Sequence, residues 1–177
     1  MVVYHGSNHS FQTMRIRKDL TKQSTLENEG YGIYFSLSRA VAESYGKWLY
    51  TIAVNDRFLV DMRSMKNCRA YVMKLRQEML TMFKIRLEDY IDLSMVARYL
   101  NGGGVAICGV ATEVKNLLDS SELFYMQNGS KVEAIFAYLN KWTGVPKAYI
   151  FPYHIKDCGI IRDLSPTVAG IIDKERL

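Results

Sequence analysis

The feature that most constrains the fold is the placement of strand-like segments at both ends of the chain, with helical segments between them. Short apolar stretches rich in β-branched and aromatic residues, bounded by turn signals, indicate strands. They cover residues 2–5, 32–36, 48–54, 58–62, 148–151, 158–162 and 168–172. This order predicts an α+β fold.

The middle of the chain has helical periodicity. Residues 70–83 place Val72, Leu75, Met79 and Met82 on one face, as in an amphipathic helix. Three further helices are predicted over residues 87–100, 112–126 and 131–142, and the first of them stops at an Asn-Gly-Gly-Gly breaker. Residues 63–147 are therefore expected to form a helical insertion or lobe.

The composition is that of a soluble globular protein. The chain has 177 residues, of which 49% are hydrophobic and 23% charged, and this length suits a single domain over residues 1–177. No apolar run approaches the roughly 18 residues of a membrane span, and no secretory signal is recognised. We expect a monomer in the cytoplasm of the producing cell, or of a host cell if it is delivered there.

Cysteines and charge assign no partner by themselves. Cys68, Cys108 and Cys158 are scattered and lack the spacing of zinc ligands, so reduced thiols and no metal site are expected. The net charge is +5, and basic residues cluster twice. The clusters are Arg15, Arg17, Lys18 and Lys22, then Lys66, Arg69, Lys74 and Arg76. They suit an acidic protein, a nucleic acid or cofactor phosphates, but also plain solvated surface.

Two motifs near the N-terminal end, followed by a tyrosine, form the most specific pattern in the chain. The motifs read Tyr4-His5-Gly6-Ser7 and Gly30-Tyr31-Gly32-Ile33-Tyr34-Phe35-Ser36, and Tyr45 follows eleven residues after Tyr34. This pattern resembles the ADP-ribosyltransferase superfamily, in the branch with a His-Tyr-acid triad that includes diphtheria toxin and the poly-ADP-ribose polymerases. The resemblance implies a split β-sheet core that binds NAD. The long loop over residues 8–31 is expected to be a binding loop, although it contains no clear adenine pocket.

The resemblance also implies roles for individual residues. Tyr34 and Tyr45 would stack against the cationic nicotinamide ring, and Gly6 would let the backbone approach the carboxamide. His5 would bond a ribose hydroxyl of the adenosine half, with Ser7 assisting. One departure is Ala42, which stands where the polymerases carry a carboxamide-binding serine. Ser38 or Ser44 would replace that serine only if the helix were shifted.

The third member of the triad is an acid at the start of a late strand, which stabilises the positive charge that develops on the ribose. Asp157, before an apolar segment, is the best match and puts Asp in place of the usual Glu. Glu133 and Glu122 remain as alternatives, and Asp157 also fits a plain turn residue. His5, Tyr34 and Asp157 are thus the expected catalytic residues.

The implied activity is mono-ADP-ribosyl transfer from NAD to a macromolecular acceptor, with a protein favoured over a nucleic acid. A small basic chain of this kind resembles phage modifiers such as anti-CRISPR transferases, and bacterial toxins or effectors. Two other hypotheses stay open. One is a catalytically degenerate module of the same fold that binds NAD or a partner, and the other is a basic nucleic-acid-binding protein.

Overall fold

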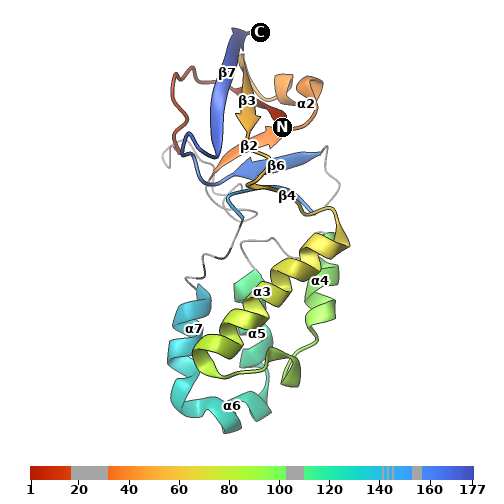
Figure 1. The fold of residues 1–177 in the computed structure, drawn as a ribbon, viewed down its shortest axis with the longest axis vertical. Coiled ribbons are helices and arrows are strands. Elements are labelled where there is room, and N and C mark those ends of the chain that lie inside the picture. The colour runs from red at the N-terminus through yellow and green to blue at the C-terminus, as the bar shows by residue number, and fades with distance from the viewer. Residues whose placement is uncertain (17–31, 103–109, 141, 143, 145, 153–156) are drawn as a thin grey trace. The chain divides into compact units, whose positions relative to one another are not determined.

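A computed structural model describes residues 1–16, 32–102, 110–140, 142, 144, 146–152 and 157–177. The chain divides into two compact units, a sheet unit (Met1–Arg63 and Pro146–Leu177) and a helical unit (Ser64–Val145) (Figure 1). The helical unit covers nearly the same residues as the predicted insertion, 63–147. Gly30, Tyr31, Arg17, Lys18, Lys22 and Cys108 lie outside the described residues.

In the described residues, the sheet unit contains a seven-stranded sheet with the order β4-β5-β6-β2-β1-β3-β7. Its strands are β1 (Val2–Ser7), β2 (Ile33–Ser36), β3 (Trp48–Val54), β4 (Leu59–Asp61), β5 (Ala148–Ile150), β6 (Cys158–Ile161) and β7 (Ala169–Arg176). The β4–β5 pair is parallel, and the other pairs are antiparallel. The two ends of the chain thus build one sheet, and the α+β prediction is confirmed.

The sheet is joined only narrowly between β1 and β2. β1 pairs with β3 along its whole length, and β2 pairs with β6 along its whole length. By contrast, β1 and β2 share a single register pair, Tyr4 opposite Ser36. Figure 1 shows β3 and β7 running steeply across the direction of β6. The sheet therefore has two halves, β4-β5-β6-β2 and β1-β3-β7, that meet at the β1–β2 junction.

Strand alternation separates the two faces of the sheet. Val3, Ile33, Phe35, Tyr50 and Ile52 are all buried in one hydrophobic core. We call their side of the sheet the core face, and the side of the intervening residues the opposite face. The short helix α2 (Arg39–Glu43) packs against β1, β2 and β3.

The helical unit consists of α3 (Met65–Phe83), η1 (Leu87–Asp89), α4 (Leu93–Gly102), α5 (Val110–Asp119), α6 (Glu122–Asn128), η3 (Gly129–Lys131) and α7 (Val132–Asn140). Its core is a second apolar cluster centred on Leu75, Met79, Val114, Leu118 and Phe124. No described helix is long and apolar enough to cross a membrane.

Capping residues divide two of the predicted helices. The segment predicted as one helix over 87–100 breaks at Asp92, whose Oδ1 accepts from the N–H groups of Ser94 and Met95 (2.9 and 3.3 Å). The segment over 112–126 breaks at Ser121, whose Oγ accepts from the Phe124 N–H (3.2 Å). A polar side chain that satisfies free N–H groups begins a new helix in both places.

The predicted apolar face of α3 includes one residue, Met82, that the structure leaves exposed. Met82 is 56% exposed, whereas Met79 is completely buried. Phe83, four residues after Met79, packs against the core of the helical unit instead. The buried stripe of α3 therefore continues at i+4 from Met79 and leaves Met82 outside it.

Candidate functional site

His5 and Tyr34 come together across the β1–β2 junction. His5 Nδ1 donates a hydrogen bond to the Tyr34 carbonyl oxygen (2.6 Å), and a carbonyl can only accept. Burial lowers the pKa of His5 from its usual value, although the bond to Tyr34 opposes this effect. The ring is therefore neutral at pH 7, with its proton on Nδ1, so Nε2 can accept a hydrogen bond from a ligand.

Gly6 is the point at which α2 approaches β1. A Cβ atom at Gly6 would lie 1.9 Å from the Ala42 carbonyl oxygen and 3.0 Å from Tyr45 Cβ. No side chain fits there, and this close approach places Tyr45 beside β1. The Tyr45 side chain is 56% exposed and is therefore open to a ligand.

Tyr34 projects from the opposite face of the sheet. Its neighbours Ile33 and Phe35 point into the core, so alternation directs Tyr34 away from it. The Tyr34 ring lies 5.8 Å from the Phe151 ring, centroid to centroid. Tyr4 and Ser36 are directly paired and therefore lie on the same face. Gly6 is two residues from Tyr4, and Tyr34 is two residues from Ser36, so Gly6 and Tyr34 share that face. Gly6, Tyr34 and Tyr45 thus share the opposite face, while His5 points to the core face.

A cavity of about 470 Å³ lies beside His5. It is lined by His5, Ser7 and residues of the following loop, including Phe11 and Arg15. Phe11 ties the described start of this loop to the sheet, because its ring stacks on Tyr50 at 3.9 Å and its N–H donates to the Tyr50 hydroxyl (2.7 Å). Sequence reasoning missed this cavity. Its sequence signals were the expected binding loop over residues 8–31 and the basic residue Arg15 within it.

The serines near Ala42 are already engaged in α2. Ser38 begins the helix, with its Oγ accepting from the Val41 N–H (3.4 Å). The Ser44 hydroxyl donates to the Val41 carbonyl (2.7 Å). Ala42 itself is fully buried. Neither serine takes over the position of Ala42.

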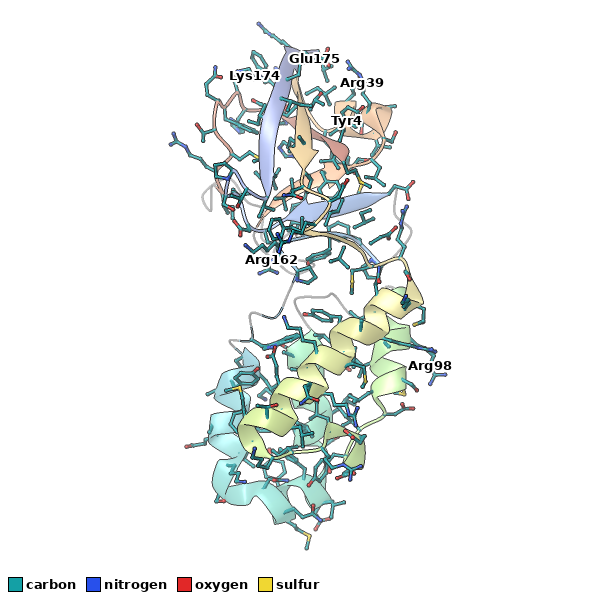
Figure 2. All side chains as sticks on the ribbon, viewed as in Figure 1. Tyr4, Arg39, Arg98, Arg162, Lys174 and Glu175 are labelled. Carbon is teal, nitrogen blue, oxygen red and sulfur yellow. The ribbon has the colours of Figure 1, made fainter. Side chains whose placement is uncertain are left out.

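An ion pair ties α2 to the edge of the sheet. Arg39 contacts Glu175 of β7 (2.6 Å) as well as Glu43 of its own helix (2.8 Å). Figure 2 shows Arg39 and Glu175 close together at the end of the sheet unit. The helix that carries Tyr45 toward Gly6 is therefore anchored to both β1 and β7.

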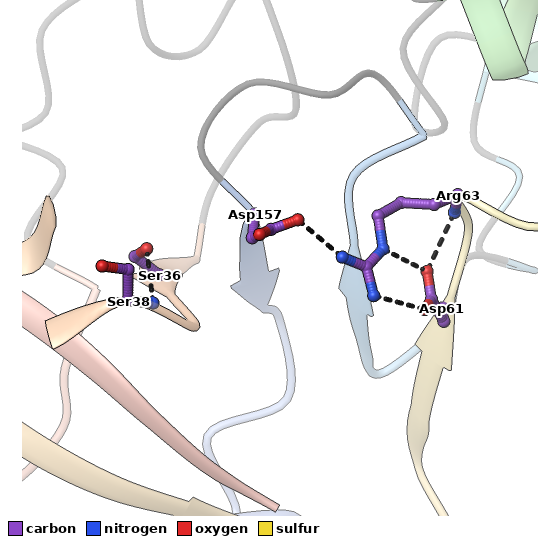
Figure 3. Close-up of polar contacts among 5 residues, drawn as sticks. All are labelled: Ser36, Ser38, Asp61, Arg63 and Asp157. Atoms are coloured by element: carbon purple, nitrogen blue, oxygen red, sulfur yellow. Dashed lines mark hydrogen bonds and ion pairs between the residues drawn. The ribbon is translucent and has the colours of Figure 1, made fainter.

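Asp157 lies directly before β6. It adopts a left-handed backbone conformation (φ 48°), and its carbonyl oxygen accepts from the Leu37 N–H (3.0 Å), just after β2. Its Oδ1 accepts from NH1 of Arg63 (2.6 Å) (Figure 3). The side chain is 55% exposed. Cys158, the next residue, pairs with Ser36 and so faces the same side as Tyr34.

The two alternative acids occupy different surroundings. Glu122 is the first residue of α6, and Glu133 is the second residue of α7. Both are exposed on helices of the helical unit rather than placed before a strand. Of the three acids, Asp157 alone has the position that the resemblance requires.

Comparison with protein-family models, with curated proteins and with solved structures finds no match for this chain. Across the described residues, His, Cys, Asp and Glu side chains form no group of three or more that could hold a metal ion.

Proposed function

We propose that this chain is an NAD-dependent mono-ADP-ribosyltransferase. The observation that carries the proposal is the meeting of His5, Gly6, Tyr34 and Tyr45 around the β1–β2 junction. These residues come from β1, β2 and the turn after α2, and they are the ones that the sequence resemblance singles out. A narrow junction between two half-sheets also agrees with the split sheet that the resemblance implies.

The nicotinamide ring would lie on the face that carries Gly6, Tyr34 and Tyr45. A flat cation is attracted to tyrosine faces, and the close approach at Gly6 places Tyr45 beside β1 on that face. In the reaction, the bond between ribose C1′ and the ring nitrogen breaks, and its electron pair leaves with neutral nicotinamide. A nucleophilic atom of the acceptor then bonds to C1′ and releases its proton. A carboxylate, assigned here to Asp157, stabilises the charge on the ribose between these events.

The adenosine half and the diphosphate would occupy the cavity beside His5. Arg15 supplies a cation for the phosphates, and the free Nε2 lone pair of His5 suits a ribose hydroxyl. Ser7 lies at the same wall of the cavity. NAD would thus pass through the β1–β2 junction, with its two halves on the two faces.

The acceptor is proposed to be a protein in the cytoplasm of the producing or recipient cell. One ADP-ribose per acceptor site is the simplest outcome for a chain of this size. The chain would then act like the phage-encoded modifiers or bacterial effectors that the sequence resembles. The helical unit is the part available to choose the acceptor.

A second candidate function is an NAD-binding module without catalysis. Two observations favour it: Ala42 replaces the carboxamide-binding serine, and the Asp157 carboxylate is engaged by Arg63. One observation weakens the hypothesis of a nucleic-acid-binding protein. Arg76, in the second of the two basic clusters, is paired with Glu88 (2.5 Å). A charge already paired in this way adds little to phosphate binding.

The test is to incubate the protein with NAD and a bacterial lysate, using NAD labelled in the adenine for acceptors and in the nicotinamide for release. Labelled protein and released nicotinamide are expected. Tyr45→Ala should weaken NAD binding about 2- to 13-fold, since an aromatic contact is worth roughly 0.5–1.5 kcal/mol. Tyr125→Ala, at another partly exposed tyrosine (40%), is the matched control and should leave NAD binding unchanged.

Three results can follow. Release with labelled protein supports the transferase. NAD binding without release points to the non-catalytic module, and no binding at all rejects both.

A further inference from the structure

A chain of three side chains leads from β4 to the start of β6. Arg63 Nε and NH2 donate to the two carboxylate oxygens of Asp61 (2.9 and 2.7 Å), and the Arg63 N–H also donates to Asp61 Oδ1 (3.0 Å). The remaining NH1 group donates to Asp157 Oδ1 (2.6 Å). Figure 3 shows the guanidinium between the two carboxylates.

The bonds to Asp61 hold the Arg63 guanidinium in place independently of Asp157. A two-pronged bond to Asp61 sets the plane of the Arg63 side chain, and a planar fork has little freedom left once both prongs are bound. Arg63 is also the better covered partner, with 29% of its side chain exposed against 55% for Asp157. Bonding to Asp61, and then to Asp157, raises the pKa of Arg63, so it stays cationic. Arg63 is therefore the fixed partner, and Asp157 is the one that is held.

Asp157 also has an unusual backbone. A φ of 48° is uncommon for residues with a side chain, although Asp in a turn tolerates it better than most. Arg63 bonds only Oδ1, and among the described residues no partner is found for Oδ2. One oxygen is thus held by the protein, and the other is left for a ligand hydroxyl.

We propose that Arg63, itself fixed by Asp61, is a positioning residue that orients the Asp157 carboxylate toward the nicotinamide ribose. The inference rests on the proposed function and on Asp157 as its acid. Arg63 acts through Asp157 and does not contact NAD. Its loss should therefore slow bond cleavage without weakening NAD binding.

The test compares nicotinamide release (kcat) and NAD affinity (Kd, by calorimetry) in the full chain and its variants. Arg63→Met keeps the length of the side chain but removes the charge and the fork. It is expected to lower kcat about tenfold or more and to change Kd less than threefold, since small misplacements of reacting groups cost up to ~10²-fold. Arg63→Lys, which keeps a cation, should recover part of the loss.

Two further variants separate positioning from a general structural effect. In an Asp157→Asn background, Arg63→Met should cause no further loss, because the group that it orients is gone. Lys147→Met removes another ion pair of the sheet unit, to Asp163 (2.9 Å), and should leave kcat unchanged. The melting temperature of each variant shows whether the fold is retained.

Each contrary outcome overturns the inference in a recognisable way. If the unaltered protein releases no nicotinamide, the proposed function fails and the inference fails with it. If the protein is active and Asp157→Asn is equally active, the function stands but the acid is another residue. If Arg63→Met raises kcat, the ion pair with Arg63 keeps the Asp157 carboxylate away from the ribose instead of orienting it. If its loss is the same in both backgrounds, or if Lys is no better than Met, the role of Arg63 is only structural.

Discussion

Gly6 is the residue at which the fold and the proposed NAD site depend on the same contact. Its Cα lies so near to α2 that an added Cβ would be 1.9 Å from the Ala42 carbonyl oxygen, where ordinary contacts begin at 3.4 Å. The obstructing atom belongs to backbone, so no side-chain rotation relieves the clash. In Gly6→Ala, α2 must therefore withdraw by about 1.5 Å, the difference between these distances.

The expected cost has two parts. Overpacking of this kind destabilises a domain by about 1–3 kcal/mol, and each kcal/mol lowers the melting temperature by roughly 4–8 °C in a domain of 60–100 residues. In addition, α2 carries Tyr45, so its withdrawal widens the space in which the nicotinamide would be held. A misplacement of about 1 Å at a reacting centre can cost ~10²-fold, so nicotinamide release should fall by about that factor.

The assay is thermal unfolding of Gly6→Ala together with its rate of nicotinamide release at a temperature where the variant is folded. Gly170→Ala is the matched control, because Gly170 lies on β7 in the same unit and a Cβ there meets nothing within 4 Å. That variant should be as stable as the original chain or slightly more so, since Gly is entropically costly in a strand. If Gly6→Ala melts and reacts like Gly170→Ala, the close approach of β1 and α2 is wrong.

Two other predictions concern pH and the helical unit. Burial lowers the pKa of His5 below its usual value of 6.5, so on acidification the unfolded chain takes up a proton that the folded chain refuses. Stability should therefore fall as the pH drops through 6.5, and less steeply in His5→Gln; equal slopes between about pH 7.5 and 5.5 would contradict a lowered pKa for His5. Met79→Ala should lower the free energy of unfolding by about 2–5 kcal/mol, because Met79 is fully buried. Met82→Ala, at a 56% exposed position, should change this free energy by less than about 0.5 kcal/mol. Urea titrations of both variants measure the difference. A comparable loss in both variants would contradict the observed face of α3.

The sequence is informative about the sheet wherever burial on one face imposes alternation. Trp48–Val54 is found with the predicted bounds for this reason. β7 was predicted over 168–172 but extends to Arg176. The sequence does not indicate this end of the strand, because its last residues are charged and resemble a solvated tail. They pair with β3 at the edge of the sheet, and Lys174 lies over the Trp48 ring (5.0 Å). Pairing to a neighbour, rather than burial, makes this segment a strand, and pairing leaves no local hydrophobic signal.

Helix boundaries were less predictable than helix content. The hydrophobic spacing over 87–100 and 112–126 continues across Asp92 and Ser121, so periodicity alone gives one helix in each segment. Both breaks had a local signal, since Asp and Ser are favoured first residues of helices. A capping residue within an apolar pattern is ambiguous from the sequence, because it can also lie on the exposed face of a continuous helix.

Whether a part of the candidate site could be predicted from the sequence depends on how far apart in the chain its contacting residues are. His5, Gly6, Tyr34 and Tyr45 fall within 41 residues, and their spacing carries the pattern by itself. The contact between Arg63 and Asp157 joins residues 94 positions apart, and it depends on β5 lying between β4 and β6. Nothing near Asp157 in the sequence indicates this partner. Sequence reasoning could therefore nominate an acid by its place before a strand, whereas how that acid is held follows only from the order of the strands. Substitutions at Arg63 and Asp61 consequently test the assignment of Asp157 more directly than any further comparison of motifs.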